Sequence, residues 1–292
     1  MTPFAYIEPN CLEDALAMLH QYGAEARVLA GGQALLLALK NRTVRPACLL
    51  SLARIAELRG WNYDAKGSLQ VGATTTYSTI ETASLEGWHK EIAGVAGNLA
   101  DRALRNMGTL GGAACQAEQR YDVPTLLVGV EAHLTLASAA GERVLSASEF
   151  FDRGGGTRLV PSEILTKITF APGSAYSSVA FEKFRFRVFD AAIVSVVCAL
   201  NLAGDGRVAG ARLVVGAVEK SPVPAPLAAR ELIGLRPSAD LPPGFAERTA
   251  EEVLPAANAK TRYRRYQAEL IKALVVQAVR RALSESRGAI QP

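Results

Sequence analysis

The sequence predicts an α+β protein of two or three lobes. Its 292 residues are 49% hydrophobic and 21% charged, an ordinary globular composition with enough apolar material for a large core. Runs with helical spacing of apolar residues alternate with short apolar or alternating runs that favour strands. The chain is organised around two glycine pairs, Gly31-Gly32 and Gly111-Gly112, each between an apolar run and a following small or apolar run.

Composition and residue spacing exclude several kinds of site. The 32 basic and 28 acidic residues give a net charge of +4, too balanced to favour nucleic acid or an anionic membrane as partner. We expect a cytoplasmic protein without a membrane span, because no signal peptide and no apolar run of about 18 residues is evident. We expect no zinc or iron–sulfur site on this chain, because no Cys-x-x-Cys or Cys/His pair at ligand spacing occurs. The cysteines are interpreted as small buried hydrophobes: Cys11, Cys48, Cys115 and Cys198.

The first lobe is predicted to be a small β-α-β-like unit. Asn10 can cap its first helix, with Glu13 three residues later as in a capping box, and Gly23 ends the helix. A buried strand at residues 28–30 is followed by a helix at 33–40 and a second strand at 48–52. The lobe ends near Leu58.

The second lobe begins with an alternating strand at Leu69, after which Thr75 or Thr76 can cap a short helix. A longer helix is predicted from His89 to Leu104, directly before the second glycine pair. The next predicted elements are a helix at residues 122–132 and a strand at 134–136. Ser146 or Ser148 can then cap a short helix, and a glycine loop at 154–156 leads to an alternating strand at 164–170.

The third part is predicted to pair strands through an Asp205-Gly206 turn, because Asp-Gly between two apolar runs is typical of a hairpin. Its elements are strands at residues 179–184, 191–202 and 208–218 and helices at 245–253 and 262–283. The changes of pattern, with the turn at Pro172-Gly173, predict three domains, at residues 1–58, 59–172 and 173–292.

The two glycine pairs are candidate anion-binding loops, since backbone N–H groups without a neighbouring Cβ can approach a phosphate closely. One glycine pair is a weak signal, because most such pairs are only tight turns. Neither G-x-G-x-x-G nor a Walker loop occurs. Together, the two pairs suggest one phosphate-bearing cofactor held from two sides.

Further motifs share an order and spacing over about residues 4–284. They are F-x-Y-x-x-P at residues 4–9, A-G-G-Q-x-L-L at 30–36, V-G-A-T-T-T-Y at 71–77, R-N-x-G-T-x-G-G at 105–112, Asp122, Lys183 and Asp190. This set resembles the flavin-binding medium subunits of molybdenum hydroxylases, the family that contains carbon monoxide dehydrogenase and xanthine dehydrogenase.

The resemblance implies a bipartite FAD-binding domain of the vanillyl-alcohol oxidase type, followed by a C-terminal α/β sandwich domain. It implies that the first loop holds the FAD diphosphate and that the second supports the diphosphate and the region near the isoalloxazine. The residues so implied are Ala30, Gly31, Gly32, Gln33, Ala34 and Leu35 in the first loop, and Thr109, Leu110, Gly111, Gly112 and Ala113 in the second. Asp122 matches an aspartate that bonds the nucleotide end of FAD, and Leu99, Leu165 and Lys183 match positions that line the cofactor.

Two positions depart from the family pattern. Ala113 stands where asparagine is usual, and Gln119 stands where a proline usually precedes the aspartate by three. Loss of the asparagine amide removes a side-chain anchor worth roughly 0.5 to 1.5 kcal/mol. Two candidate site residues also have plainer interpretations: Asp122 could be the N-cap of its helix, and Lys183 could lie with Arg185 and Arg187 on a solvated strand face.

The resemblance implies the FAD-carrying electron-transfer subunit of a multi-subunit molybdenum hydroxylase. A large subunit would carry the molybdenum cofactor and a small subunit two [2Fe–2S] clusters, as a dimer of heterotrimers, and the flavin would pass electrons to an external acceptor. One alternative is a flavin-poor structural or assembly subunit, with Ala113 and Gln119 as signs of a decayed site. Another is a stand-alone flavin oxidase, which is disfavoured because no substrate acid/base and no covalent-flavin histidine motif is found.

Overall fold

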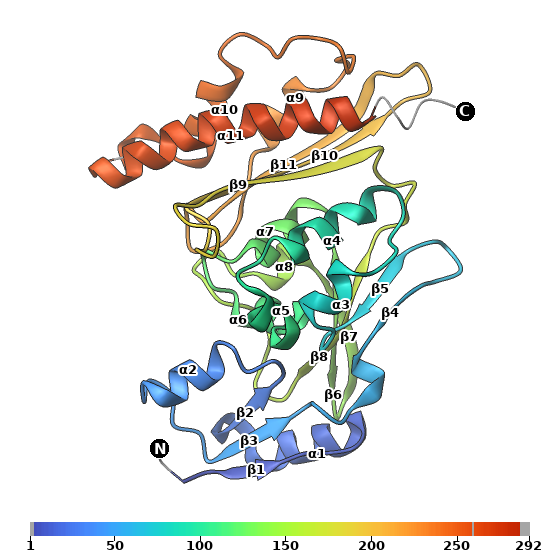
Figure 1. Cartoon of the computed structure of the whole chain (residues 1–292), viewed down its shortest axis with the longest axis vertical. Coiled ribbons are helices and arrows are strands. Elements are labelled where there is room, and N and C mark those ends of the chain that lie inside the picture. The colour runs from blue at the N-terminus through green and yellow to red at the C-terminus, as the bar shows by residue number, and fades with distance from the viewer. Residues whose placement is uncertain (1–2, 259, 287–292) are drawn as a thin grey trace.

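The computed structural model describes residues 3–258 and 260–286, which form three sheets along the long axis of the molecule (Figure 1). The first lobe is a parallel sheet in the order β1-β3-β2. Its strands are β1 (Ala5–Ile7), β2 (Ala26–Leu29) and β3 (Cys48–Ser51), with helices α1 (Leu12–Tyr22) and α2 (Leu35–Lys40). The predicted β-α-β arrangement of β2, α2 and β3 is confirmed, and its two strands are parallel, whereas the edge strand β1 was not predicted.

The predicted capping of the first helix is wrong. The N-cap residue of α1 is Cys11, which makes no side-chain cap. A carboxylate from outside the helix takes the place of the capping box: the Leu12 N–H donates to Glu57 Oε1 at 2.9 Å. The helix begins where a distant acceptor satisfies its first amide, and local spacing cannot reveal such an acceptor.

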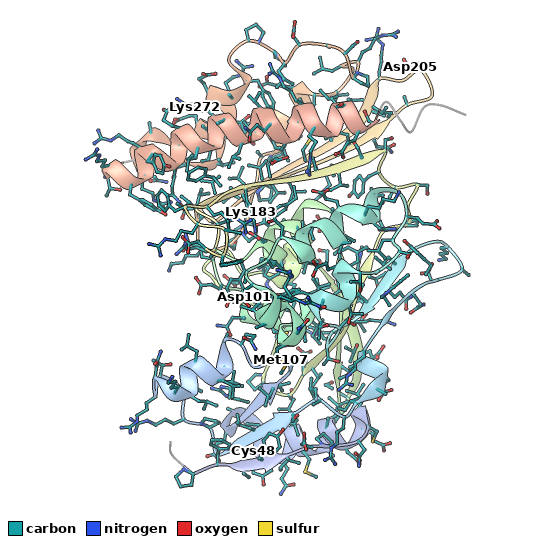
Figure 2. All side chains as sticks on the ribbon, in the orientation of Figure 1. Cys48, Asp101, Met107, Lys183, Asp205 and Lys272 are labelled. Atoms are coloured by element: carbon teal, nitrogen blue, oxygen red, sulfur yellow. The ribbon has the colours of Figure 1, made fainter. Side chains whose placement is uncertain are left out.

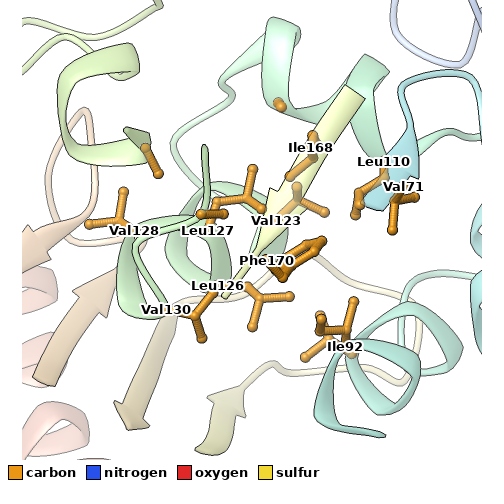
Figure 3. Close-up of a cluster of buried hydrophobic side chains, with 14 of the residues drawn as sticks. Val71, Ile92, Leu110, Val123, Leu126, Leu127, Val128, Val130, Ile168 and Phe170 are labelled. Carbon is orange, nitrogen blue, oxygen red and sulfur yellow. The ribbon is translucent and has the colours of Figure 1, made fainter. Parts of the chain in front are cut away.

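The second lobe is an antiparallel five-stranded sheet in the order β4-β5-β8-β6-β7 with helices packed on it. Its elements are β4 (Trp61–Tyr63), β5 (Leu69–Gly72), α3 (Tyr77–Glu81), α4 (Lys90–Gly97), α5 (Arg102–Met107), α6 (Leu110–Gln116), α7 (Asp122–Gly129), β6 (His133–Ser138), β7 (Gly141–Ser146), α8 (Ala147–Phe150) and β8 (Ile164–Phe170). In its core, Phe170 of β8 lies near Leu126 of α7, and Ile168 of the same strand lies near Val123 of α7 (Figure 3).

The long helix predicted from His89 to Leu104 is broken. Helix α4 ends at Gly97, Ala100 takes a positive φ of 40°, and Asp101 caps α5 by accepting from the Leu104 N–H at 2.8 Å. The apolar periodicity continues across the break, so the pattern hides it. The capping predictions at Thr76 and Ser146 are confirmed.

The second glycine pair also differs from its prediction. Gly111 and Gly112 lie in the first turn of α6, which Thr109 caps by accepting from the Gly112 N–H at 3.0 Å. The pair therefore begins a helix that was not predicted, and does not form a turn.

The third part is an antiparallel sheet in the order β12-β11-β10-β9. Its elements are β9 (Ser178–Phe184), β10 (Val194–Leu202), β11 (Val208–Gly216), β12 (Val223–Pro224), α9 (Pro226–Glu231), α10 (Phe245–Val253) and α11 (Arg262–Ser286). The predicted hairpin is confirmed. Helix α11 covers one face of this sheet, and α7 of the second lobe packs on β10 and β11 (Figure 1). No helix in the described ranges is both long and apolar enough to cross a membrane.

Candidate cofactor site

A cavity of about 640 Å³ lies where the three parts of the chain meet. Its walls come from the first glycine loop, from the α5–α6 region, and from the β9–β10 connection. The volume is within the usual range of sites for small molecules and cofactors, about 300 to 1,000 Å³. Apolar side chains dominate its lining, and a few polar groups converge on it.

The first glycine loop carries a row of free hydrogen-bond donors. It joins β2 to α2, and Gly32 takes a φ of +73°, which favours glycine. The N–H groups of residues 31–35 have no acceptor among the described residues, and the helix pattern begins only with the Leu36 N–H, which donates to the Gly32 carbonyl at 2.9 Å. Such a row before a helix is an anion-binding arrangement.

The two glycine segments lie against each other. A Cβ built on Gly31 would lie 2.0 Å from the Met107 carbonyl oxygen and 3.0 Å from Gly108 Cα. Figure 2 shows Met107 at the edge of the second lobe that faces the first lobe. Only glycine at position 31 allows this approach of two backbones, so the absent side chain is what lets the cavity close here.

The second segment contributes shape more than amide donors. The Leu110 N–H donates to the Thr75 carbonyl at 3.1 Å and the Gly111 N–H to the Ala73 carbonyl at 3.0 Å. These amides are therefore already paired with protein acceptors, contrary to the expectation that glycine amides of both loops face the cofactor. The Thr109 hydroxyl accepts from Gly112, which leaves its own proton for a ligand.

A buried ion pair forms another wall of the cavity. Lys183 Nζ lies 2.5 Å from Asp122 Oδ2, with only 6% and 3% of the two side chains exposed, and Nζ also donates to the Asn98 carbonyl at 2.9 Å. Burial raises the pKa of Asp122, and the Lys183 ammonium opposes that rise. Asp122 Oδ1 is buried without a hydrogen-bond partner in the described part of the chain, so it is a ready acceptor for a ligand hydroxyl.

The ion pair between Lys183 and Asp122 tests two other interpretations that the sequence left open. The N-cap residue of α7 is Tyr121, and the Asp122 carboxylate bonds Lys183, so the interpretation of Asp122 as the helix cap is wrong. The solvated-face interpretation is wrong for Lys183, because its side chain is buried. Arg185 and Arg187 lie beyond the end of β9, so neither is on a strand face, and of the two only Arg187 is exposed.

Fourteen of the fifteen residues implied by the motifs line this one cavity: Ala30, Gly31, Gly32, Gln33, Ala34, Leu35, Leu99, Thr109, Gly111, Gly112, Ala113, Asp122, Leu165 and Lys183. The exception is Leu110, whose side chain is 2% exposed and belongs to the core. Sequence reasoning missed Arg27, Arg120 and Glu163, which also line the cavity. Tyr77 does so too, and its place in the V-G-A-T-T-T-Y motif was the only available signal.

Comparison with known proteins identifies the family of the chain and the cofactor that this family binds. Residues 2–171 match the family described as FAD binding domain in molybdopterin dehydrogenase. The chain belongs to this family. Residues 179–282 match a second family, the CO dehydrogenase flavoprotein C-terminal domain. The resemblance drawn from the motifs is thereby confirmed, and the chain is an FAD-binding oxidoreductase subunit.

Individual relatives match over nearly the whole chain. The glyceraldehyde dehydrogenase medium chain of Sulfolobus acidocaldarius is 30% identical over 278 residues, which cover 94% of this chain and 96% of the relative. The carbon monoxide dehydrogenase medium chain of Afipia carboxidovorans is 28% identical and covers 84% and 85%. The crystal structure of quinoline 2-oxidoreductase from Pseudomonas putida 86 contains a chain that is 30% identical, with a TM-score of 0.85 and 99% of both chains covered. This likeness confirms the predicted α+β FAD-binding fold.

The residues present fit FAD. The free amides of residues 31–35 suit a diphosphate, the orphaned Asp122 Oδ1 suits a sugar or ribityl hydroxyl, and Leu99 and Leu165 offer apolar wall to a ring system. Ala113, in place of the usual asparagine, is 6% exposed and its N–H donates to the Thr109 carbonyl. The substitution therefore removes a possible side-chain anchor without disturbing the first loop.

The contact at Gly31 predicts a large effect of a single methyl group. Gly31→Ala places a Cβ against the Met107 carbonyl, so the two segments must separate, and we expect FAD to bind at least about tenfold more weakly, or ~1.4 kcal/mol. Gly173→Ala is the control, because a Cβ there meets nothing within 4 Å. Fluorescence titration of the flavin-free chains measures the difference, and equal dissociation constants for the two variants would contradict the prediction.

The buried pair predicts a pH effect on stability. In flavin-free Lys183→Met, the buried Asp122 carboxyl loses its compensating charge and its pKa rises further. The unfolded chain ionises above a pKa of about 3.9 while the native carboxyl keeps its proton. The native state then binds more protons, so the free energy of unfolding falls as pH rises, by up to about 1.4 kcal/mol per pH unit.

The control is Asp122→Asn combined with Lys183→Met, which has no carboxyl to titrate at this position. Urea unfolding from pH 5 to pH 8 should show the single variant losing stability relative to the double variant. Parallel profiles would show that the carboxyl does not titrate as proposed.

Proposed function

We propose that this chain carries FAD as the electron-transfer subunit of a cytoplasmic molybdenum hydroxylase. The observation that carries the proposal is that one cavity is lined by residues 31–35, whose amides have no acceptor among the described residues, and by Asp122, whose Oδ1 has no partner there. The relatives named as medium chains support a multi-subunit enzyme. In this proposal a large subunit holds the molybdenum cofactor, a small subunit holds [2Fe–2S] clusters, and the assembly is a dimer of heterotrimers.

Bound FAD would supply the redox chemistry, taking electrons from the clusters and passing them to an external acceptor. The chain's own residues bind and orient it. The first loop neutralises the diphosphate through backbone donors, and Asp122, held by Lys183, accepts from a hydroxyl. No side chain of the cavity need act as a general acid or base for this role.

An exposed aromatic surface beside the cavity fits the docking of an electron donor. We call it the mouth patch; its members and exposed fractions are Phe186 70%, Val188 66%, Phe189 63%, Tyr263 52% and Tyr266 38%. The Phe186 and Tyr266 rings are parallel within 4°, with centroids 6.4 Å apart, so the β9–β10 connection and α11 form one surface. Phe189 also lines the cavity, which places the patch at the edge of the cofactor site.

Three exposed arginines are neighbours in sequence of members of the mouth patch. Arg187, Arg262 and Arg265 are exposed and have no ion-pair partner among residues 3–258 and 260–286. Aromatic and arginine side chains are enriched where proteins associate. We propose that the iron–sulfur subunit docks here through an apolar centre with an acidic rim, close enough to deliver electrons to the flavin.

The flavin content of the chain tests the function directly. The chain expressed alone should be yellow, and after removal of the flavin it should quench FAD fluorescence in a saturable titration. The flavin-poor assembly subunit predicts no saturable binding, and a colourless chain that cannot be reconstituted would overturn the proposal. Turnover of a substrate by the isolated yellow chain would instead favour the stand-alone oxidase.

Docking at the mouth patch predicts a loss that is specific to the complex. Phe186→Ala should weaken the affinity for the co-expressed iron–sulfur subunit by about 2 kcal/mol, or roughly 30-fold, because buried aromatics dominate interface energy. The two subunits should then no longer co-elute. Leu227→Ala on α9 is the control, since Leu227 is 62% exposed outside the patch. Both variants should keep FAD; co-elution unchanged by Phe186→Ala would remove the patch from the interface.

A further inference from the structure

One wall of the cavity has little buried surface to hold it in place. Phe189, Asp190 and Ala191 line the cavity from the β9–β10 connection, yet Phe186 and Phe189 of that connection are 70% and 63% exposed. The Asp190 N–H bonds only within the connection, to the Arg187 carbonyl at 3.1 Å. Stacking of Phe186 on Tyr266 anchors the start of the connection, so the position of residues 189–191 must be set by bonds from other elements.

Arg120 of the second lobe supplies such bonds. Its Nε donates to the Ala192 carbonyl and its Nη2 to the Ala191 carbonyl, each at 3.1 Å. A planar guanidinium can reach two consecutive carbonyls with fixed geometry, whereas a lysine ammonium offers no such fork. Arg120 also lines the cavity itself, two residues before Asp122.

Its neighbour Gln119 ties the same loop to the end of β11. Gln119 Nε2 donates to the Ala217 carbonyl at 3.3 Å. The α6–α7 loop thus bonds the third part at two places, and the Gln119 bond could not form with the proline that the family pattern places at that position.

We propose that Arg120 is a positioning residue that holds the wall of residues 189–191 over the cavity and so slows the release of FAD. The inference rests on the proposed function, because it presupposes that FAD occupies the cavity. It makes a claim that the proposed function does not make. Retention of FAD depends on the two hydrogen bonds of Arg120 to the Ala191 and Ala192 carbonyls, and not on the charge of Arg120 acting on the FAD phosphates.

The test compares Arg120→Ala, Arg120→Lys and Arg153→Ala in the FAD-loaded chain. Arg153 is an exposed arginine of the 154–156 glycine loop region and lies outside the cavity lining. The rate of FAD release into an excess of a flavin-trapping protein is followed by fluorescence at low and high salt. We expect release to be about tenfold faster in both Arg120 variants at either salt concentration, because a charge-assisted fork is lost in each, and unchanged in Arg153→Ala.

A second readout follows the wall itself. Trypsin should cleave the FAD-loaded Arg120 variants after Arg187 faster than the wild-type chain, while the melting temperatures of the flavin-free chains stay alike, since Arg120 is exposed. A purely structural role would lower the melting temperature as well.

Each other outcome overturns a defined claim. If Arg120→Lys released FAD at the wild-type rate, or if the effect depended on salt, Arg120 would act through a charge contact with FAD. The proposed role of its bonds to the Ala191 and Ala192 carbonyls would then be overturned. Unchanged release in Arg120→Ala from a chain that binds FAD would overturn this inference alone. A wild-type chain that binds no FAD would overturn the proposed function and this inference with it.

Discussion

The structure depends on one close approach of backbone to backbone. The first glycine loop contacts the end of α5 so tightly that a Cβ on Gly31 would lie 2.0 Å from the Met107 carbonyl oxygen. Interiors are packed densely enough that such a contact cannot absorb a methyl group without moving an element. The contact joins the parallel sheet of the first lobe to the helices of the second, at a loop that lines the cavity and whose amides at residues 31–35 have no acceptor among the described residues.

The third part completes the site through charge. Lys183, on β9, reaches Asp122 at the start of α7 and the Asn98 carbonyl at the break between α4 and α5. Removing one partner from a buried pair costs more than the pair gains, because it leaves an uncompensated charge. The pair thus fixes the position of the third sheet relative to the second lobe, while it leaves one carboxylate oxygen free for a ligand.

Elements with local signals could be predicted from the sequence. The Asp205-Gly206 hairpin, the caps at Thr76 and Ser146 and the first glycine loop all depend on residues near each other in the chain. The missed features either depend on a distant partner or are hidden by a pattern that continues through them. Glu57 supplies the cap of α1, and the break after Gly97 has no apolar signature because helical spacing continues through it.

In the candidate site too, the local motifs could predict some features, whereas others depend on distant contacts. The motif resemblance implied the lining residues, but it could not show that the amides of Leu110 and Gly111 are paired with protein carbonyls. Nor could any local pattern reveal that Arg120 bonds carbonyls of the third part, since those acceptors lie about 70 positions away, as the separations of 71 and 72 show. Function could be inferred from the loop chemistry, whereas the division of labour between the two glycine segments required their three-dimensional contacts.

A crystal structure of the chain with FAD tests the central claim most directly. The account predicts the diphosphate within hydrogen-bond distance of the N–H groups of residues 31–35, with the Thr109 hydroxyl beside it and Asp122 Oδ1 accepting from a hydroxyl of the cofactor. A diphosphate held elsewhere, with those amides facing water and the contact between Gly31 and Met107 opened, would contradict it.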